Sequence, residues 1–207
     1  MINVLIVEDS KITRNTIERQ LSSQGEYSIK ASIENAANAE IACLSGNIDL
    51  VLMDVCTADG ESGLLAAKSI KLNYPKIKII IMTSMPEHSF IKKAKDYGCD
   101  SFWYKEYGNT DLLDICSRTM NGESVWPTEL PVIPVGCTDS TELTEKEYEI
   151  IKNLSLGLKY EEIADEMGIT VNTVKYHIKN LLQKTGYRNT VQLAVNVIDK
   201  RLILPKY

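Results

Sequence analysis

Charged and hydroxyl side chains directly follow several short apolar runs of this sequence. Glu8 and Asp9 come directly after one run, and Asp54 ends another. Thr83 and Lys105 occupy the same place after two further runs. Carboxylates brought together repel one another, so a shared pocket needs a cation to neutralise it. Because oxygen ligands without histidine or cysteine favour Mg²⁺ over zinc, the pattern predicts an acidic Mg²⁺ site with a hydroxyl and an ammonium group beside it.

A parallel sheet is the architecture that brings these residues together. Strands are predicted at 2–7, 27–33, 48–53, 77–82 and 101–104, and helices alternate with them at 11–23, 35–44, 63–73, 87–97 and 110–120. This alternation predicts a doubly wound α/β fold whose five-stranded sheet presents all its carboxyl ends at one edge. Any one of the polar residues could instead be a helix cap or a surface charge, but their shared position at strand ends favours a site.

The sequence changes character between residues 122 and 141. Pro127, Pro131 and Pro134 stand in this stretch, and no helical periodicity runs through it. Prolines stiffen an extended chain and remove backbone donors, so a connector is favoured over an additional packed strand. We therefore predict one domain at 1–121, a linker at 122–141 and a second domain at 142–207.

The second domain is predicted to be helical. Thr144 can cap a first helix, and Glu147 three residues later completes a capping box. Further helices are predicted at 160–167, from 172 or 173 to about 185, and at 189–201. Gly168 separates the second helix from the third, and two short helices joined by a glycine-containing turn form a helix-turn-helix.

The third of these helices has two different faces. Its core face carries Val174, Ile178, Leu181 and Leu182, whereas Lys175, Tyr176 and Lys179 point outward. The stretch 167–198 contains no aspartate or glutamate. A solvated helix with a lysine stripe is the alternative, but the absence of acids and an exposed tyrosine favour a helix that enters the major groove of DNA.

Composition argues against several other classes of protein. The net charge is −5, the apolar opening stops at Glu8 and is too short for a signal peptide, and no apolar run approaches the roughly 20 residues of a membrane helix. The five cysteines lack metal-binding spacing, which favours reduced thiols and a cytoplasmic location. An aspartyl phosphatase would have Asp-x-Asp after the first strand, and a flavodoxin would have a Ser/Thr/Gly-rich loop there. This chain has neither.

Residues 1–121 resemble the receiver domain of bacterial two-component response regulators. The likeness is carried by Val7-Glu8-Asp9, Leu52-Met53-Asp54, Met82-Thr83-Ser84 and Lys105. It implies a flavodoxin-like sheet of order 2-1-3-4-5 and a phosphoacceptor at Asp54, which takes the phosphoryl group from a phosphohistidine of a sensor histidine kinase.

The resemblance also implies the ligands of the metal ion. Asp9 and Asp54 would bind Mg²⁺ together with the backbone carbonyl of Cys56, and Glu8 would act through water. Cys56 and Met85 occupy positions that often orient water toward the phosphoryl group in this family. Because side chains of this kind cannot activate water, we expect slow loss of the phosphoryl group.

Three further residues take family roles by the same likeness. Lys105 would pair with the phosphoryl oxygens, and Thr83 would donate its hydroxyl to them and move inward. Phe102 would be the switch aromatic, although plain core packing is an equally good reading. The family usually has proline after the lysine, whereas Glu106 stands here.

Residues 143–204 resemble the LuxR-type DNA-binding domain of the NarL/FixJ family. The likeness is carried by Leu143-Thr144-x-Lys146-Glu147, Gly157, Glu162-Ile163-Ala164, Ile169-Thr170, Thr173-Val174-Lys175-x-His177 and Lys184. It implies that Lys175, Tyr176 and Lys179 contact bases and nearby backbone, while Thr173 and Arg188 bind phosphates. The last helix would either cover the core or pair with a second copy on DNA.

Together these features predict a transcription regulator rather than an enzyme. Phosphorylation of Asp54 would expose the DNA-binding helix and promote homodimerisation, because one phosphate supplies the charge that shifts a bistable domain. The partners would be double-stranded DNA and a sensor histidine kinase, with Mg²⁺ as cofactor and no membrane. The alternative is a regulator that binds DNA without phosphorylation and uses its receiver only for dimerisation or docking.

Overall fold

The computed structural model describes residues 1–105, 111–200, 202 and 203. It divides into two compact units, Met1–Glu129 and Leu130–Tyr207. None of the described helices has the length and apolar character that a membrane span requires. The five cysteines are free thiols. Glu106, the residue that replaces the family's usual proline, lies outside the described residues.

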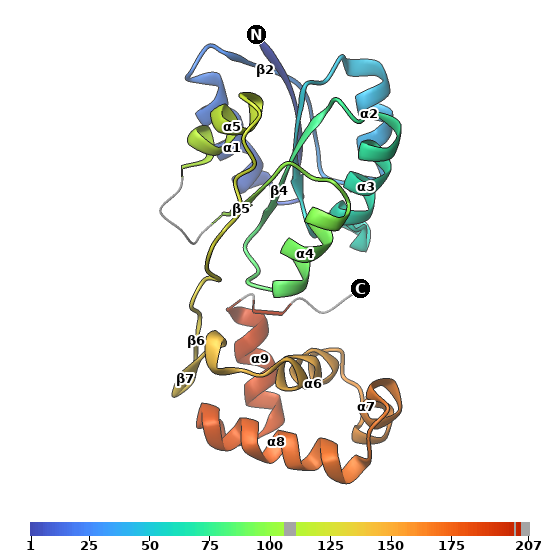
Figure 1. The fold of residues 1–207 in the computed structure, drawn as a ribbon. Helices are drawn as coiled ribbons and strands as arrows, with labels where there is room; N and C mark the ends of the chain where they lie inside the picture. Colours follow the sequence, from blue (N-terminus) through green and yellow to red (C-terminus); the bar gives the residue numbers. More distant parts are fainter. Residues whose placement is uncertain (106–110, 201, 204–207) are drawn as a thin grey trace. The chain divides into compact units, whose positions relative to one another are not determined.

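The first unit is built on a parallel sheet (Figure 1). Its strands are β1 (Ile2–Val7), β2 (Tyr27–Ile33), β3 (Leu50–Asp54), β4 (Lys78–Thr83) and β5 (Ser101–Tyr104). The order β2-β1-β3-β4-β5, with every neighbouring pair parallel, confirms the predicted topology. All residues of β3 are buried, as expected of a central strand covered on both faces.

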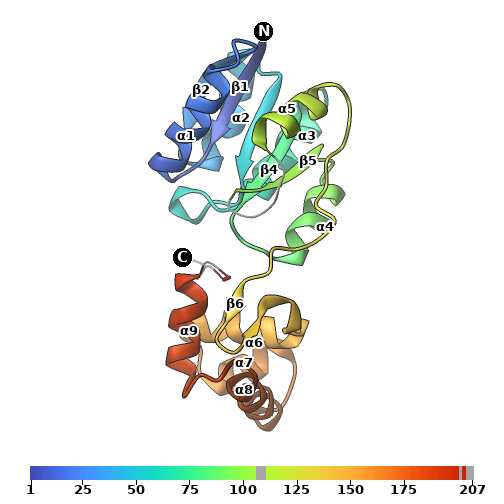
Figure 2. The ribbon, with the colours of Figure 1, turned by 90° about the vertical axis from the view of Figure 1, so that its left-hand side faces the viewer.

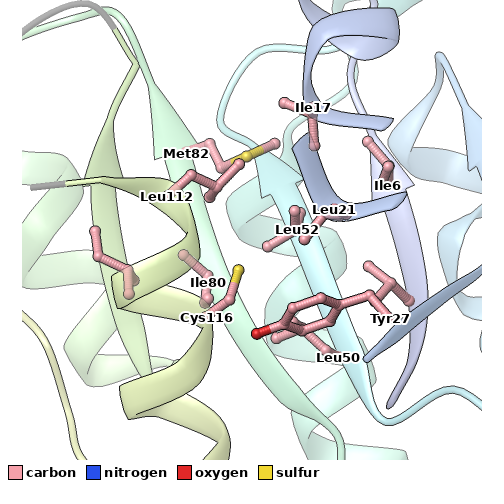
Figure 3. Packing of buried hydrophobic residues seen from close by; sticks show 12 residues of the cluster. Ile6, Ile17, Leu21, Tyr27, Leu50, Leu52, Ile80, Met82, Leu112 and Cys116 are labelled. Atoms are coloured by element: carbon pink, nitrogen blue, oxygen red, sulfur yellow. The ribbon is translucent and has the colours of Figure 1, made fainter. Parts of the chain in front are cut away.

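Helices cover both faces of this sheet. They are α1 (Lys11–Ser22), α2 (Ala39–Gly46), α3 (Gly63–Asn73), α4 (His88–Asp96) and α5 (Leu112–Met120), with short 3₁₀ turns η1 (Ala36–Asn38) and η2 (Ala58–Gly60). The core between α1, α5 and the sheet contains Ile17, Leu52, Met82 and Cys116, all at most 1% exposed (Figure 3). Burial of such side chains stabilises the unit by roughly 1.5–3 kcal/mol each.

The range expected to be a linker is largely attached to the two units. In the first unit, the backbone N–H of Val125 donates to Ser101 Oγ, and Phe102 N–H donates to the carbonyl of Val125. In the second unit, β6 (Pro134–Val135) and β7 (Thr138–Asp139) form an antiparallel hairpin. This corrects the expected connector, because Pro134 begins its strand and Val135 is buried, so proline does not exclude this short ladder.

The second unit is helical beyond the hairpin (Figure 2). It contains the 3₁₀ turn η3 (Ser140–Glu142) and the helices α6 (Glu145–Ser155), α7 (Tyr160–Met167), α8 (Val171–Thr185) and α9 (Thr190–Asp199). The capping box between Thr144 and Glu147 is present at the start of α6. Gly168 ends α7 in the left-handed conformation and Thr170 caps α8, which together form the turn of the helix-turn-helix.

Candidate functional site

Three carboxylates meet at the carboxyl-terminal edge of the sheet in the first unit. Glu8 and Asp9 follow β1, and Asp54 is the last residue of β3. One oxygen from each of the three lies within 4.8 Å of the others. Glu8 and Asp54 are buried whereas Asp9 is exposed, so the cluster is closed at its base and open at its rim. Three carboxylates at this spacing could hold a metal ion.

Lys105 enters the same cluster from the end of β5. Its Nζ lies 2.9 Å from Asp54 Oδ2 and 2.5 Å from Glu8 Oε2, and its side chain is only 9% exposed. The strand β4 fixes this position, because Lys105 N–H donates to the carbonyl of Thr83. Glu8 is held at its other oxygen, Oε1, by the backbone N–H of Ser10. One ammonium group therefore contacts two of the three carboxylates, those of Glu8 and Asp54.

This environment changes the protonation of the central residues. Burial raises the pKa of Asp54 to about 7, with Lys105 opposing that rise and the charges of Glu8 and Asp9 adding to it. Burial alone would lower the pKa of Lys105, but its carboxylate neighbours outweigh this effect and raise the pKa. The lysine is therefore firmly cationic, and a metal cation would favour the ionised form of Asp54.

The loop after Asp54 approaches the site closely enough to require glycine. A Cβ on Gly63 would lie 1.7 Å from the carbonyl oxygen of Asp54, so any side chain there would displace the start of α3. Within the loop, Asp59 adopts a left-handed conformation with φ of 61°, and Asn35 donates to its side chain. The segment is thereby fixed to the end of β2.

The remaining expected residues of the first unit surround this cluster. Thr83 is 2% exposed, and its Oγ1 accepts from the backbone N–H of Met85, which leaves the hydroxyl hydrogen for another acceptor. Cys56 Sγ lies 3.9 Å from Met85 Sδ, and burial raises the pKa of Cys56 to about 12, so the thiol stays neutral. Phe102 is 1% exposed and packs edge-on against the ring of Tyr104.

The second unit presents an exposed cationic face on α8. Val174, Ile178 and Leu181 are buried as expected, and Leu182 is half-buried. Lys175, Tyr176 and Lys179 are exposed on the other side of the helix, together with Asn172 and Gln183. Tyr176 is 62% exposed, and its ring lies edge-on to that of the neighbouring His177.

The two other residues expected at DNA lie at the ends of α8. Thr173 is half-buried in the first turn, and its Oγ1 lies 2.8 Å from Thr170 Oγ1. Arg188 is exposed in the loop after the helix. Lys184 differs from these residues, because it binds the carboxylate of Glu147 at 2.8 Å and so joins α8 to the start of α6.

Two residues at the first site were not singled out from the sequence. Arg14, in the first turn of α1, donates to the backbone of the carboxylate pair. Tyr104 is 5% exposed, and its hydroxyl has no hydrogen-bond partner in the described part of the chain. Neither has a sequence signal: an arginine in a helix and an aromatic residue in a strand are both common without special roles.

Comparisons with known proteins agree with both halves of this description. Residues 4–117 match the family model for the response regulator receiver domain, and residues 141–197 match that for bacterial regulatory proteins of the luxR family. The response regulator protein VraR of Staphylococcus aureus strain Mu3 is 32% identical over 98% of this chain and 99% of its own length. VraR of Staphylococcus epidermidis strain RP62A is 31% identical over 98% and 99%.

A solved structure shares the fold over nearly the whole chain. RcsB from Salmonella enterica serovar Typhimurium, bound to a promoter in the presence of phosphomimetic BeF₃⁻, matches with a TM-score of 0.60 and 18% identity. The match covers 97% of this chain and 98% of that one.

Proposed function

Because the chain belongs to the response regulators that join a receiver domain to a luxR-family domain, we propose that phosphorylation of Asp54 controls its binding to DNA. The observation that carries this proposal is the contact between buried Asp54 and Lys105 beside Glu8 and Asp9. An idle receiver would not need this costly arrangement of buried charges, so the alternative in which the domain only docks or dimerises is less favoured.

Asp54 would act as the nucleophile toward a phosphorylated sensor histidine kinase. Its carboxylate attacks phosphorus, the bond from phosphorus to the kinase histidine breaks, and an acyl phosphate remains on Asp54. Lys105 Nζ lies 2.9 Å from the accepting carboxylate and can neutralise the phosphoryl oxygens as they arrive. Phosphoryl transfer depends mainly on positioning and charge neutralisation, which a preformed pocket supplies.

The donor set fits Mg²⁺. Glu8, Asp9 and Asp54 offer carboxylate oxygens only, and hard oxygen ligands suit Mg²⁺ better than zinc. Both oxygens of Glu8 are already bonded, to Ser10 N–H and to Lys105, so Asp9 and Asp54 would be the direct ligands, with the backbone carbonyl of Cys56, and Glu8 would act through water. When bound, the ion would neutralise charge on the incoming phosphoryl group.

Thr83 and Phe102 would transmit the effect of Asp54 phosphorylation to the rest of the first unit. The free hydroxyl hydrogen of Thr83 can be donated to the acyl phosphate, which would draw the end of β4 inward. Phe102 lies on β5, whose Trp103 and Tyr104 pair with Met82 and Thr83 of β4, so a shift of β4 would reach its ring. We assign Phe102 the role of switch aromatic on this basis.

The exposed face of α8 would then enter the major groove of double-stranded DNA. Lys175, Tyr176 and Lys179 would contact bases and nearby backbone, and Thr173 and Arg188 would bind phosphates. A helix-turn-helix dimer reads two half-sites, so we propose a homodimer in the bound state. Because the target is the bacterial chromosome, the place of action would be the cytoplasm, and the chain would act as a regulator rather than an enzyme.

Phosphorylation in vitro tests the first step. The full chain is incubated with acetyl phosphate, with and without Mg²⁺, and its intact mass is measured. We expect one phosphoryl group per chain only when Mg²⁺ is present, and none in Asp54→Ala. Asp96→Asn, which changes an exposed carboxylate on α4, is the matched control and should be phosphorylated normally. Phosphorylation of Asp54→Ala to the same extent would refute the assignment.

A further inference from the structure

Arg14 donates hydrogen bonds to the backbone of two of the three carboxylate residues, Glu8 and Asp9. It lies in the first turn of α1, and its side chain is 16% exposed. Its Nη1 donates to the carbonyl oxygen of Glu8 at 2.5 Å and lies 3.4 Å from the carbonyl oxygen of Asp9. The guanidinium therefore caps two successive carbonyl groups between β1 and α1.

The two carboxylates differ in how much else holds them. Glu8 is fixed from several directions, because its side chain accepts from Ser10 N–H and Lys105, and its own N–H donates to the carbonyl of Ile33. Asp9 is exposed at the rim of the pocket. The contact from Arg14 to the backbone at Asp9 is therefore well placed to decide where the Asp9 carboxylate lies.

Arg14 also approaches Glu34, a residue whose backbone contacts the loop that follows Asp54. Its Nη2 lies 3.9 Å from Glu34 Oε2 at the end of β2. The carbonyl of Glu34 accepts from Ala58 N–H, in the segment that leaves the site. Arg14 thus links the segment carrying Glu8 and Asp9 to Glu34, and through the backbone of Glu34 to the segment that follows Asp54.

We propose that Arg14 is a positioning residue that sets the affinity of the Asp54 pocket for its divalent cation. This inference rests on the proposed function. The guanidinium is a planar fork with several donors, a geometry that lysine lacks although it carries the same charge. Arg14 has two opposing effects on the affinity for the cation. Its positive charge repels the cation and lowers the affinity, whereas its hydrogen bonds hold the ligands in place and raise it. The structure favours the second effect, because the guanidinium bonds the backbone rather than the carboxylates of Glu8 and Asp9.

The test uses the full chain and Mg²⁺ as the probe. Unfolding of the first unit is followed by fluorescence of Trp103 and Trp126, both within Met1–Glu129. The rise of the unfolding midpoint with Mg²⁺ concentration gives the dissociation constant of each variant, relative to its own metal-free midpoint. Arg14→Lys and Arg14→Ala are compared with Arg19→Ala, which removes an exposed arginine from the last turn of the same helix.

Loss of a residue that orients metal ligands weakens metal affinity by about 10- to 100-fold. We expect a loss in this range for both Arg14→Ala and Arg14→Lys, and none for Arg19→Ala. Wild-type affinity in Arg14→Lys would show that charge alone matters and would overturn the proposal, as would tighter binding in Arg14→Ala. Absence of any Mg²⁺ response in the wild-type chain would overturn the metal site itself, and with it the proposed function.

Discussion

Replacement of Asp54 by asparagine removes a charge that is costly to bury. The pKa of Asp54 is raised from 3.8 to about 7, chiefly by burial. At about 1.36 kcal/mol for each pKa unit, ionisation of Asp54 lowers the free energy of unfolding by at most about 4 kcal/mol above pH 7. The attraction of Lys105, which asparagine loses, opposes the rise and is already included in this net pKa. We therefore expect Asp54→Asn to stabilise the metal-free protein at pH 8 by up to about 4 kcal/mol.

The pH dependence follows from the direction of the shift. Because the pKa of Asp54 is higher in the folded state, the folded state holds a proton that the unfolded chain has released between pH 3.8 and about 7. The stability contributed by the protonated side chain is complete below the unfolded pKa and is lost as the pH rises through about 7. The advantage of Asp54→Asn over wild type should accordingly be small at pH 5 and largest at pH 8.

Urea unfolding monitored by the two tryptophans measures this difference in the first unit. The series is recorded at pH 5, 7 and 8, without divalent cations and then with Mg²⁺. Mg²⁺ should stabilise wild type more than Asp54→Asn and so narrow the difference between the two proteins at pH 8, since it binds the folded carboxylate cluster. Asp96→Asn, an exposed change, should behave as wild type throughout. An equal pH response of wild type and Asp54→Asn would refute the reasoning about burial.

Three further predictions concern other contacts of the two units. Lys179→Ala should weaken DNA binding by about 1 kcal/mol or more and reduce its salt dependence, measured by fluorescence anisotropy, whereas Lys146→Ala on α6 should do neither. The phosphoryl group should persist for minutes or longer, because Cys56 and Met85 cannot activate water, and Cys56→Asn should shorten its lifetime. A half-life of seconds in the wild-type chain would contradict this. Tyr104→Phe should stabilise the metal-free first unit by about 1 kcal/mol in urea unfolding, because it removes a buried hydroxyl that has no partner among the described residues. A loss of stability would mean that this hydroxyl is bonded.

The sheet could be predicted because its strands are strongly apolar and regularly spaced. Residues 50–54 are buried throughout, and it is the short length of such an apolar run that favours a strand over a buried helix. Once the strands are parallel, Glu8, Asp54 and Lys105 must approach one another, since they follow strands that share one edge. The acidic cluster was therefore foreseeable from the order of elements alone.

The hairpin and the role of Arg14 depend on contacts between distant residues, and sequence patterns do not report these. The strands β6 and β7 pair over two residues each, which is too short for any periodicity. The hairpin is held by the rest of the second unit, for example by Cys137 N–H donating to the carbonyl of Thr185 and by Lys200 Nζ donating to the carbonyl of Pro134. Arg14 likewise has its role only in the folded chain, where its guanidinium reaches the carbonyl oxygen of Glu8.

Capture of genomic DNA by the full chain measures the link between the two units most directly. Sheared DNA from the source bacterium is bound by wild type and by Asp54→Ala, each with and without acetyl phosphate and Mg²⁺, and the retained fragments are sequenced. We predict a discrete set of fragments that wild type enriches at least about tenfold on phosphorylation, equivalent to roughly 1.4 kcal/mol, and that Asp54→Ala does not enrich. The same fragments at the same yield in all four samples would contradict control of DNA binding by Asp54.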